Sequence, residues 1–421
     1  MNKKMNGKSV LTYYERKQCI LCESTDLNQV LELTPTPWAD DYVTKDLVDK
    51  KQEPIPLNIM LCRNCGHAQL SHIIDAEHVY LNYTYETAST LGLGDHFKTS
   101  ADSIMRDFKP KEGGLVIDIG SNDGILLKHF QDHGMRVLGI DPMPGIAEKA
   151  TNNGIPTLPK FFDEDFSLKL RSKYGPAEVI TSNNLVADTD DLTAFVKGVR
   201  NLMKEDSIFF FETFYLYLQI NNFVWDFTYH EHYSYFTVKP LISYFGKLGL
   251  EIIDVKPNLT KGGSMRCTLQ LKGGIRKVNP SVFDHVQQEK KMGFPSSDVF
   301  KEYSQKINSA RDIFCKKIDG LINQQKKIVG YGASATSTTL MYHYQMGDYL
   351  EYIVDDFKVK QGLFSPGYHV PVYSSDRLYE KKPDYVIIIA WRYHKKIISK
   401  HQKFLDEGGH FIIPLPELKI I

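Results

Sequence analysis

Short apolar segments alternate with glycine turns and amphipathic stretches in the middle of the chain. Residues 115–120 (LVIDIG) and 136–141 (RVLGID) have the apolar character of buried strands, and residues 125–130 (ILLKHF) between them have a helical pattern. Further strands are expected at residues 178–182 and 208–212. Strands that alternate with helices predict a parallel sheet with helices on both faces.

The same alternation returns toward the C-terminus, after one long helix. Residues 297–325 place apolar side chains on one stripe of that helix, with charges opposite: Phe300, Tyr303, Ile307, Ala310, Phe314, Ile318 and Leu321. Strands are expected at residues 327–333, 350–356, 385–390 and 410–414. The pattern predicts a second sheet of the same type.

The N-terminal part differs, because it is rich in turns and short strands. Pro35, Pro37, Pro54 and Pro56 interrupt any long helix, and residues 57–62 (LNIMLC) have the pattern of a strand. The fold class is therefore α/β, with a small N-terminal domain ahead of two Rossmann-like domains. We expect the domains at residues 1–80, 81–275 and 276–421.

Four of the six cysteines form two Cys-x-x-Cys pairs in the first domain, whereas Cys267 and Cys315 stand alone. Two pairs on two tight turns supply the four thiolates of a tetrahedral zinc site: Cys19, Cys22, Cys62 and Cys65. Gly66 suits a turn whose amides point at sulfur. The alternatives are redox dithiols or incidental cysteines. Four sulfur ligands leave the metal no open position, so we expect a structural role.

Composition limits the classes of partner. The 421 residues carry 51 basic and 51 acidic side chains, so the formal net charge is +0. A neutral protein lacks the basic field of a general nucleic-acid or membrane-surface binder, and we expect neither partner. The sequence shows no run of about 20 apolar residues and no signal-peptide pattern, which favours a cytoplasmic protein.

The first glycine turn, residues 118–124 (DIGSNDG), departs from the Gly-x-Gly-x-x-Gly pattern of pyrophosphate-binding turns. Gly120 lets the backbone approach a ligand, whereas Asn122 and Asp123 occupy the turn, where an acidic side chain would repel a diphosphate. Asp141 ends the next strand, where a carboxylate binds ribose hydroxyls in such folds. S-adenosylmethionine, an adenosine ligand with a positive, phosphate-free tail, fits both features. An NAD-type site or a purely structural turn is the alternative.

The second glycine turn, residues 330–335 (GYGASA), lies closer to the dinucleotide pattern. A helix N-terminus follows it, and Asp355 or Asp356 ends the next strand. The motif fits a turn that binds a phosphate-bearing ligand. It fits equally well an inherited turn that binds no phosphate.

Residues 225–236 (WDFTYHEHYSYF) are dense in aromatic, histidine and carboxylate side chains. Each buried polar tip needs a partner, so a simple packed core explains the segment poorly. A histidine paired with a glutamate gives a base that titrates near neutral pH, with the carboxylate fixing the tautomer. We expect acid–base catalysis here, with a structural network or a metal site as alternatives. Tyr83 and Tyr85 are candidates for a further phenol.

Several motifs, in this order, resemble the sugar C-methyltransferases that act on nucleotide-linked 4-keto-deoxysugars. Besides the cysteines and the first turn, they are Tyr229-His-Glu-His-x-x-Tyr-Phe, residues 262–266 (GGSMR), 330–333 (GYGA), 360–367 (KQGLFSPG) and 382–386 (KPDYV). The resemblance covers nearly the whole chain. It implies a zinc-binding domain, a class I methyltransferase domain that binds S-adenosylmethionine, and a C-terminal Rossmann-like C-methyltransferase domain.

The resemblance also implies a reaction. A ketone at C4 acidifies the proton on C3 of the hexose; a base removes it, and the enolate carbon takes the methyl group of S-adenosylmethionine. His232 would be the base, tuned by Glu231, while Tyr229 and Tyr85 would hydrogen-bond the ketone oxygen.

Binding residues follow from the same resemblance. The methyl donor would contact Asp118, Gly120, Asn122, Asp123, Asp141, Pro142 and Asn183. The nucleotide-diphosphate sugar would contact Tyr83, Asp188, Arg266, Gly332 and Ser334, with Arg266 on the diphosphate. We expect a monomer or a homodimer.

Three positions depart from the family pattern. Asp188 replaces the histidine of the typical Asn-x-x-Ala-His stretch. Lys261 replaces the histidine of the typical His-Gly-Gly, and Thr336 replaces a lysine. Asp188 alters the charge of the site and Thr336 removes a cation that could meet phosphate, so the departures bear on the substrate more than on the chemistry. The alternatives are an O- or N-methyltransferase, a nicotinamide-dependent sugar oxidoreductase, or a non-catalytic zinc factor that binds RNA or protein.

Overall fold

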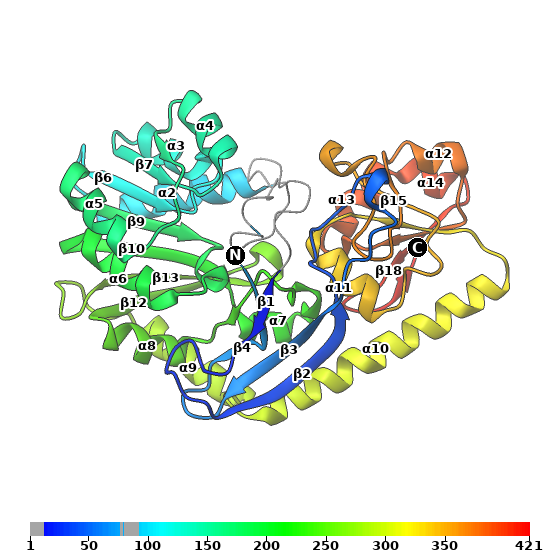
Figure 1. Ribbon diagram of the computed structural model, residues 1–421, viewed down its shortest axis with the longest axis horizontal. Coiled ribbons are helices and arrows are strands. Elements are labelled where there is room, and N and C mark those ends of the chain that lie inside the picture. Colours follow the sequence, from blue (N-terminus) through cyan, green and yellow to red (C-terminus); the bar gives the residue numbers. More distant parts are fainter. Residues whose placement is uncertain (1–11, 76–78, 80–91) are drawn as a thin grey trace.

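The computed structural model describes residues 12–75, 79 and 92–421 of the protein. Two α/β units lie side by side, and a third layer runs beneath both of them (Figure 1). This layer consists of strands β2 (Leu27–Thr36) and β3 (Ile55–Cys62) and of the predicted long helix, α10 (Ser297–Asn323). No helix of the described residues is long and apolar enough to cross a membrane.

A seven-stranded sheet forms the first α/β unit, with the strand order β12-β13-β10-β9-β6-β7-β8. The pairs from β10 to β8 are parallel, whereas β13 runs antiparallel to both of its neighbours. The bounds are β6 (Leu115–Ile119), β7 (Arg136–Ile140), β8 (Thr157–Leu158), β9 (Ala177–Asn183), β10 (Met203–Phe214), β12 (Leu250–Asn258) and β13 (Ser264–Leu271).

Helices cover both faces of this sheet, as predicted. Val116 of β6 packs in a cluster with residues of α2 (Leu93–Phe108) and α3 (Ile125–Asp132). Its neighbour Ile117 belongs to the opposite cluster, together with residues of α6 (Leu192–Leu202). Successive strand residues point to opposite faces, so both faces are buried. The other helices of this region are α4 (Pro144–Asn152), α5 (Glu164–Tyr174), α7 (Leu216–Asn221), α8 (Val238–Lys247) and α9 (Pro280–Met292).

The N-terminal domain contains a four-stranded antiparallel sheet of order β11-β4-β3-β2. Its edge strand β11 (Ser234–Tyr235) comes from the aromatic segment and pairs with β4 (Ala68–Leu70). The aromatic segment, residues 225–236, therefore completes the sheet of another domain. A second, two-stranded sheet pairs β1 (Tyr13–Glu15) with β5 (His72–Ile74).

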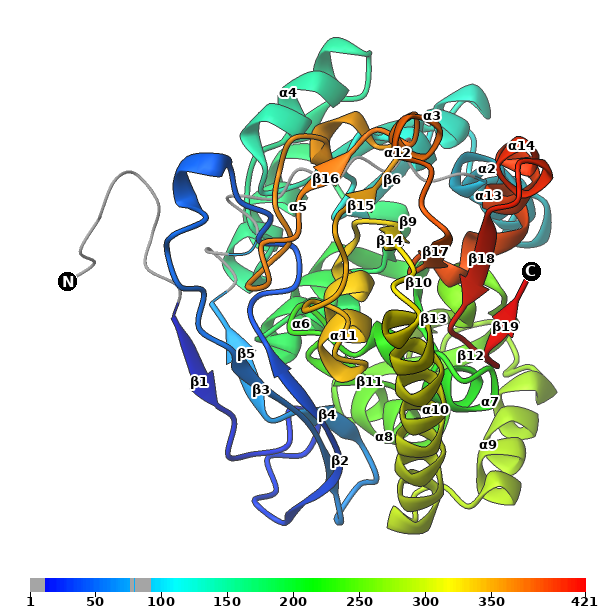
Figure 2. The same cartoon turned by 90° about the vertical axis from the view of Figure 1, so that its right-hand side faces the viewer.

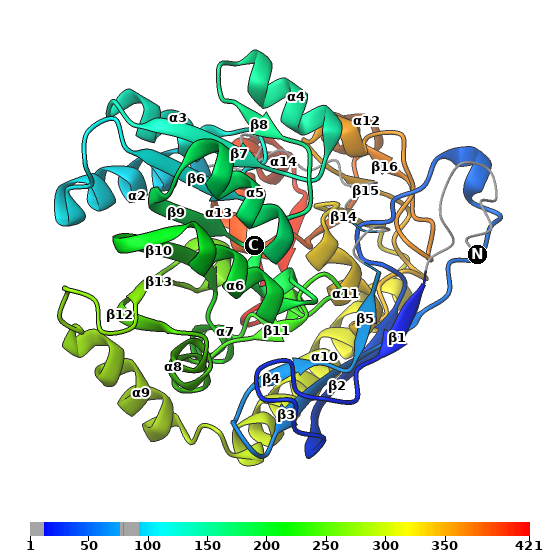
Figure 3. The ribbon, with the colours of Figure 1, turned by 60° about the vertical axis from the view of Figure 1, so that its left-hand side comes forward.

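A six-stranded sheet of order β16-β15-β14-β17-β18-β19 forms the C-terminal unit, parallel except for its last strand. Helices α10 and α11 lie beside β2 (Figures 2 and 3). The bounds are β14 (Ile328–Tyr331), β15 (Ile353–Val354), β16 (Val372–Tyr373), β17 (Tyr385–Ile388), β18 (His410–Ile413), β19 (Lys419–Ile420), α11 (Ala335–His343), α12 (Arg377–Lys381), α13 (His394–Lys400) and α14 (Gln402–Asp406).

A buried ion pair ties the aromatic segment to the C-terminal unit. Asp226 is 0% exposed, and its two carboxylate oxygens accept hydrogen bonds from Nη1 of Arg392 at 2.9 and 2.8 Å. The indole nitrogen of Trp391 donates to the same carboxylate at 2.9 Å. Nη2 of Arg392 donates to Thr336 Oγ1 at 3.0 Å, so one guanidinium links three segments of the chain.

Arg392→Met should lower the free energy of unfolding by about 3–5 kcal/mol, because it leaves the Asp226 carboxylate buried without its counter-charge. Urea unfolding measures the loss. The double variant D226N/R392M should recover part of it, since no buried charge remains. Arg311→Met is the control, because its partner Asp312 is 69% exposed, so the pair should contribute less than about 1 kcal/mol. An equal loss in the single and double variants would contradict this account.

Candidate active site and metal centre

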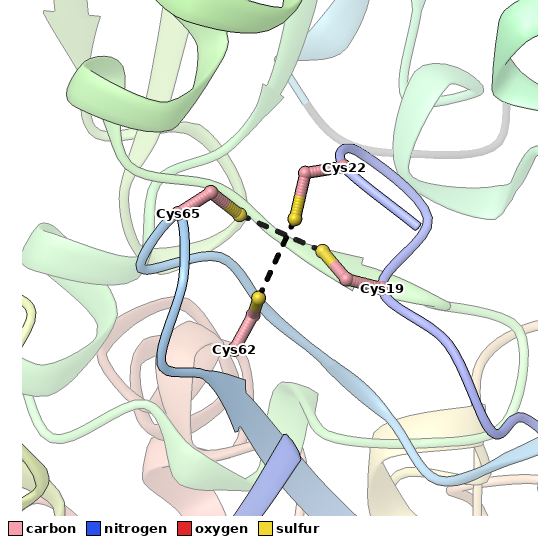
Figure 4. Close-up of side chains that lie close together, drawn as sticks. All are labelled: Cys19, Cys22, Cys62 and Cys65. Carbon is pink, nitrogen blue, oxygen red and sulfur yellow. Dashed lines mark hydrogen bonds between the residues drawn. The ribbon is translucent and has the colours of Figure 1, made fainter. Parts of the chain in front are cut away.

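Four cysteine sulfurs converge in the N-terminal domain (Figure 4). All four lie within 4.8 Å of one another, with 3.6 Å between Sγ of Cys19 and Cys65 and 3.5 Å between Sγ of Cys22 and Cys62. A tetrahedral site with Zn–S bonds of about 2.3 Å places its sulfurs roughly 3.8 Å apart. A disulfide needs a separation of about 2.05 Å. The cluster therefore fits zinc and does not fit two disulfides.

Two tight turns hold these sulfurs. The amide of Glu23 donates to the Cys19 carbonyl and that of Gly66 to the Cys62 carbonyl, both at 2.8 Å. Both residues have left-handed φ, +61° for Glu23 and +82° for Gly66. A Cβ atom at Gly66 would also lie 2.6 Å from Cβ of Pro295, so this turn requires glycine. A hydrogen bond from Cys19 lowers the pKa of Cys65 to about 5, which favours the metal-binding thiolate.

The two histidines of the aromatic segment do not form a metal site. Nε2 of His230 lies 3.3 Å from the carbonyl oxygen of Pro56, whereas Nδ1 of His232 lies 2.9 Å from that of Phe227. Within residues 12–75, 79 and 92–421, the four cysteines are the one group of ligands close enough to share an ion. The alternative that placed a metal at His-x-His is not supported.

One cavity of about 350 Å³ opens at the carboxyl ends of β6, β7 and β9. It brings together the first glycine turn and the aromatic segment, which are about 100 residues apart in the sequence. At one end its lining includes Asp118, Gly120, Asn122, Asp141, Pro142 and Asn183; at the other it includes Asp188, Tyr229, Glu231, His232 and Lys261.

Backbone amides orient the carboxylate of Asp141 at the first end of this cavity. Its two oxygens accept hydrogen bonds from the amides of Asn122 at 2.9 Å and Met143 at 3.0 Å. Asp118 accepts from the Thr181 hydroxyl at 2.7 Å, and burial raises the pKa of Asp118 to about 7. Asp123 is not among the lining residues; its carboxylate faces the Ile125 amide at 3.4 Å.

His232 is held as a neutral imidazole at the other end. It is 5% exposed and lies against the rings of Tyr229, Phe214 and Phe227, with centroid distances of 4.0, 4.5 and 5.2 Å. Because a carbonyl oxygen can only accept, Nδ1 must carry the proton donated to Phe227, which leaves the lone pair on Nε2. Burial lowers the pKa of His232 to about 3. The ring is therefore neutral at pH 7 and, contrary to the expectation from the sequence, does not titrate near neutral pH.

The expectation that Glu231 fixes the tautomer of His232 is wrong. The two adjacent side chains diverge in a turn closed by the His232 amide and the Tyr229 carbonyl at 3.0 Å. Oε1 of Glu231 accepts instead from Nε1 of Trp38, in the N-terminal domain, at 2.9 Å. Burial, followed by the nearby charge of Asp40, raises the pKa of Glu231 to about 7. The backbone carbonyl of Phe227, in place of the Glu231 carboxylate, fixes the tautomer of His232.

Arg266 does not line the cavity either. Its guanidinium lies 3.1 Å from the carboxylate of Glu212, which is 1% exposed, and also contacts the hydroxyl of Ser100. Since the buried carboxylate of Glu212 needs this counter-charge, the arginine is not free for a diphosphate, as the sequence had suggested.

The predicted substrate residues of the C-terminal unit lie outside this cavity. Ser334 accepts at its carbonyl from the Tyr42 hydroxyl at 3.5 Å, and Gly332 packs against Ala390. Asp355, a candidate for ribose, accepts from the amides of Ala333 and Phe357 at 2.6 and 2.7 Å, the same arrangement that Asp141 has in the first unit. Tyr83 and Tyr85 lie outside the described residues.

Three family models match successive parts of the chain. They are a zinc binding domain at residues 19–80, a methyltransferase domain at 95–255 and a C-methyltransferase C-terminal domain at 259–416. The chain is also 27% identical over 405 residues to C-methyltransferase NovU from Streptomyces niveus, covering 96% of each protein. Together they identify the chain as a C-methyltransferase.

Solved methyltransferases are similar to part of this C-methyltransferase. An S-adenosylmethionine-dependent methyltransferase from Clostridium acetobutylicum is 14% identical, covering 44% of this chain and 94% of its own, with a TM-score of 0.35. Magnesium protoporphyrin IX methyltransferase from Synechocystis, solved with bound SAH, is 14% identical, covering 43% of this chain and 84% of its own, with a TM-score of 0.35.

The enzyme is an S-adenosylmethionine-dependent C-methyltransferase with a class I, Rossmann-like methyltransferase domain and a zinc-binding N-terminal domain. The chemistry of the cavity fits the sulfonium of the methyl donor. Its lining includes six aspartates and Glu231 but only two lysines, Lys160 and Lys261. Such an excess of carboxylates suits a cation and opposes a diphosphate at the same place.

Two residues of this C-methyltransferase site escaped the sequence reasoning. Trp38 bonds Glu231 and Arg392 bonds Asp226, and neither belongs to a motif. A usable signal existed for Trp38, since it is one of three tryptophans, and a buried indole needs a partner for its N–H. The charge of Arg392 carried no such signal, because most arginines lie on surfaces.

Cys62→Ser should remove zinc from the C-methyltransferase and lower its melting temperature by about 10 °C, because metal binding supplies folding energy to a small domain. Metal analysis and thermal unfolding of the same sample measure both. Cys315→Ser, which removes a cysteine outside the cluster, is the control and should keep the metal. Full zinc content in the Cys62 variant would contradict the proposed ligand set.

Proposed function

We propose that the enzyme methylates C3 of a nucleotide-diphosphate-linked 4-keto-deoxysugar through an enolate. The observation that carries the proposal is the neutral imidazole of His232, whose unprotonated Nε2 belongs to the same cavity as the methyl-donor turn. A proton beside a ketone is a carbon acid that a neutral imidazole can remove when a hydrogen-bond donor stabilises the enolate, whereas an O- or N-methyltransferase needs no carbon acid.

The proposed roles follow the two ends of the cavity. S-adenosylmethionine, when bound, supplies an electrophilic methyl group. Asp141 would hold its ribose hydroxyls, and the backbone at Gly120, which lines the cavity with a left-handed φ of +76°, would lie against it. At the other end, Nε2 of His232 would take the C3 proton, and the hydroxyl of Tyr229 would bond the ketone oxygen.

The diphosphate needs cations, and two lie near the start of α11. Nζ of Lys360 is 2.8 Å from the carboxylate of Asp40 and 4.2 Å from the centre of the Tyr42 ring. Arg392 contacts Thr336 at 3.0 Å, so a cation lies beside the position where the family has a lysine. Arg392, like Arg266, is the counter-charge of a fully buried carboxylate, so we assign the diphosphate to Lys360, which it would share with the partly exposed Asp40, and to Ser334.

A panel of dTDP-, CDP- and GDP-linked 4-keto-6-deoxyhexoses, each incubated with the enzyme and S-adenosylmethionine, tests the function. Mass spectrometry should show the gain of one CH2 unit for at least one keto-sugar. The matched sugar reduced to an alcohol at C4 should not react, because it has no acidic C3 proton. Methylation of the reduced sugar would contradict the enolate mechanism.

His232→Gln should lower turnover by at least about 1,000-fold, because general-base catalysis is lost. The dissociation constant for S-adenosylmethionine, measured by calorimetry, should stay within twofold, since His232 lies at the other end of the cavity. A variant that keeps most of its activity would exclude His232 as the base.

Asp141→Asn should weaken binding of S-adenosylmethionine by about tenfold. A hydrogen bond from the ribose to a charged carboxylate contributes about 1.5 kcal/mol, which corresponds to roughly a tenfold change in the dissociation constant. Asp123→Asn is the matched control and should change the dissociation constant little, since Asp123 does not line the cavity. The reverse order of effects would show that Asp123 is the ligand.

A further inference from the structure

Lys261 occupies a backbone conformation that lysine rarely adopts. Its φ is +51°, inside the short turn Thr260–Gly262 that precedes β13. Hydrogen bonds fix this turn: Gly263 N to the Thr260 carbonyl, Asn222 Nδ2 to the Gly262 carbonyl and Thr260 N to Oδ1 of Asn258, each at 2.9 Å. Left-handed non-glycine residues that persist in a rigid turn are concentrated at functional sites.

The side chain of Lys261 lines the cavity beside His232 and Asp188. Within the part of the chain that the structure describes, no hydrogen bond or ion pair is formed by its ammonium or by the carboxylate of Asp188. Oδ1 of Asp188 is buried and has no partner. The amine of Lys261 and the carboxyl group of Asp188 therefore face the cavity without a hydrogen-bond partner in the described protein, which points to a ligand.

Charged groups from four neighbouring elements act on Lys261. Burial lowers the pKa of Lys261, and the guanidinium of Arg392 lowers it further, whereas the carboxylates of Asp188, Glu212 and Glu231 raise it. Glu212 is bonded to His96 and Arg266, and Glu231 to Trp38. Burial and the carboxylate of Glu231 raise the pKa of Asp188, whereas Lys261 lowers it, so Asp188 and Lys261 favour each other's charged form. The ammonium in turn lowers the pKa of His232, so the two groups act at one place.

We propose that Lys261 is a second catalytic residue, which donates a hydrogen bond to the ketone oxygen of the substrate while Nε2 of His232 removes the adjacent proton. In this step the C–H bond breaks and its proton passes to Nε2. The electron pair forms a carbon–carbon double bond, and the carbonyl π pair moves to oxygen, where the ammonium stabilises it. Nothing is oxidised or reduced. Asp188 is a positioning residue that keeps Lys261 protonated and oriented.

This proposal rests on the proposed function, so its test uses a readout that needs no methyl donor. The enzyme is incubated in deuterium oxide with the keto-sugar of the panel that it methylates, without S-adenosylmethionine, and deuterium at C3 is measured. Lys261→Met should slow the exchange by about 100- to 1,000-fold, as loss of one oxyanion donor does. Lys261→Arg should recover at least tenfold of this loss, because it restores a cationic donor.

Controls separate this proposal from the function and from misfolding. Lys256→Met removes an exposed lysine of β12 and should exchange at the wild-type rate. Melting temperature and donor affinity should match the wild type in every variant. If the wild type methylates no keto-sugar, the proposed function fails. If it does, but Lys261→Met exchanges within threefold of the wild type, the role of Lys261 is overturned.

The pH dependence gives a second, independent readout. An ammonium donor must be protonated, so exchange should fall as pH rises through the pKa of Lys261. Asp188→Asn removes a carboxylate that raises this pKa, so the alkaline limb should move to lower pH, and Lys261→Met should lack the limb. A rate that instead rises through this limb would mean that neutral Lys261 acts as a base, which overturns the proposal.

Discussion

The buried carboxylate of Asp226 holds the aromatic segment between domains, and the geometry of the site depends on it. Its ion pair with Arg392 fixes the turn Trp225–Phe227 against the C-terminal unit. The next carbonyl in that turn, at Phe227, receives the Nδ1 proton of His232 and so selects the nitrogen that can act as base. An interaction between domains therefore sets the tautomer of a residue in the methyltransferase cavity, although neither partner of the ion pair lines it.

Zinc acts on the same segment from the opposite side. The second cysteine pair sits on the hairpin between β3 and β4, and β4 pairs with β11 at the end of the aromatic segment. The amide of Leu70 donates to the carbonyl of Tyr233 at 2.9 Å, directly after His232. A metal without an open coordination site would thus act on the aromatic segment by fixing the strand that pairs with it. The metal would therefore affect the position of cavity residues although its ligands do not line the cavity.

Local pattern was enough to predict the strands, the helices and two groups of site residues. The cysteine pairs could be read because Cys-x-x-Cys spacing by itself gives the geometry of a metal knuckle. Asp118, Gly120 and Asp141 could be read because parallel strands end at one edge of their sheet. Contacts between residues that are distant in the sequence could not be predicted in this way. Nothing near Glu231 indicates Trp38, and nothing near Arg266 indicates that Glu212, on the neighbouring strand, will occupy it.

The chain has a net charge of zero, but acidic and basic side chains gather in different places around the cavity. Carboxylates predominate around the methyl-donor end of the cavity, where they suit a sulfonium. The cation Lys360 lies on the C-terminal side and is bonded to Asp40, so a diphosphate would share it with that carboxylate. Lys261 and Asp188 stand between these regions, without partners of their own among the described residues. In the proposed reaction the pair would be nearly neutral as a whole, so it would polarise a ketone oxygen without adding a net charge that repels either the donor or a nucleotide.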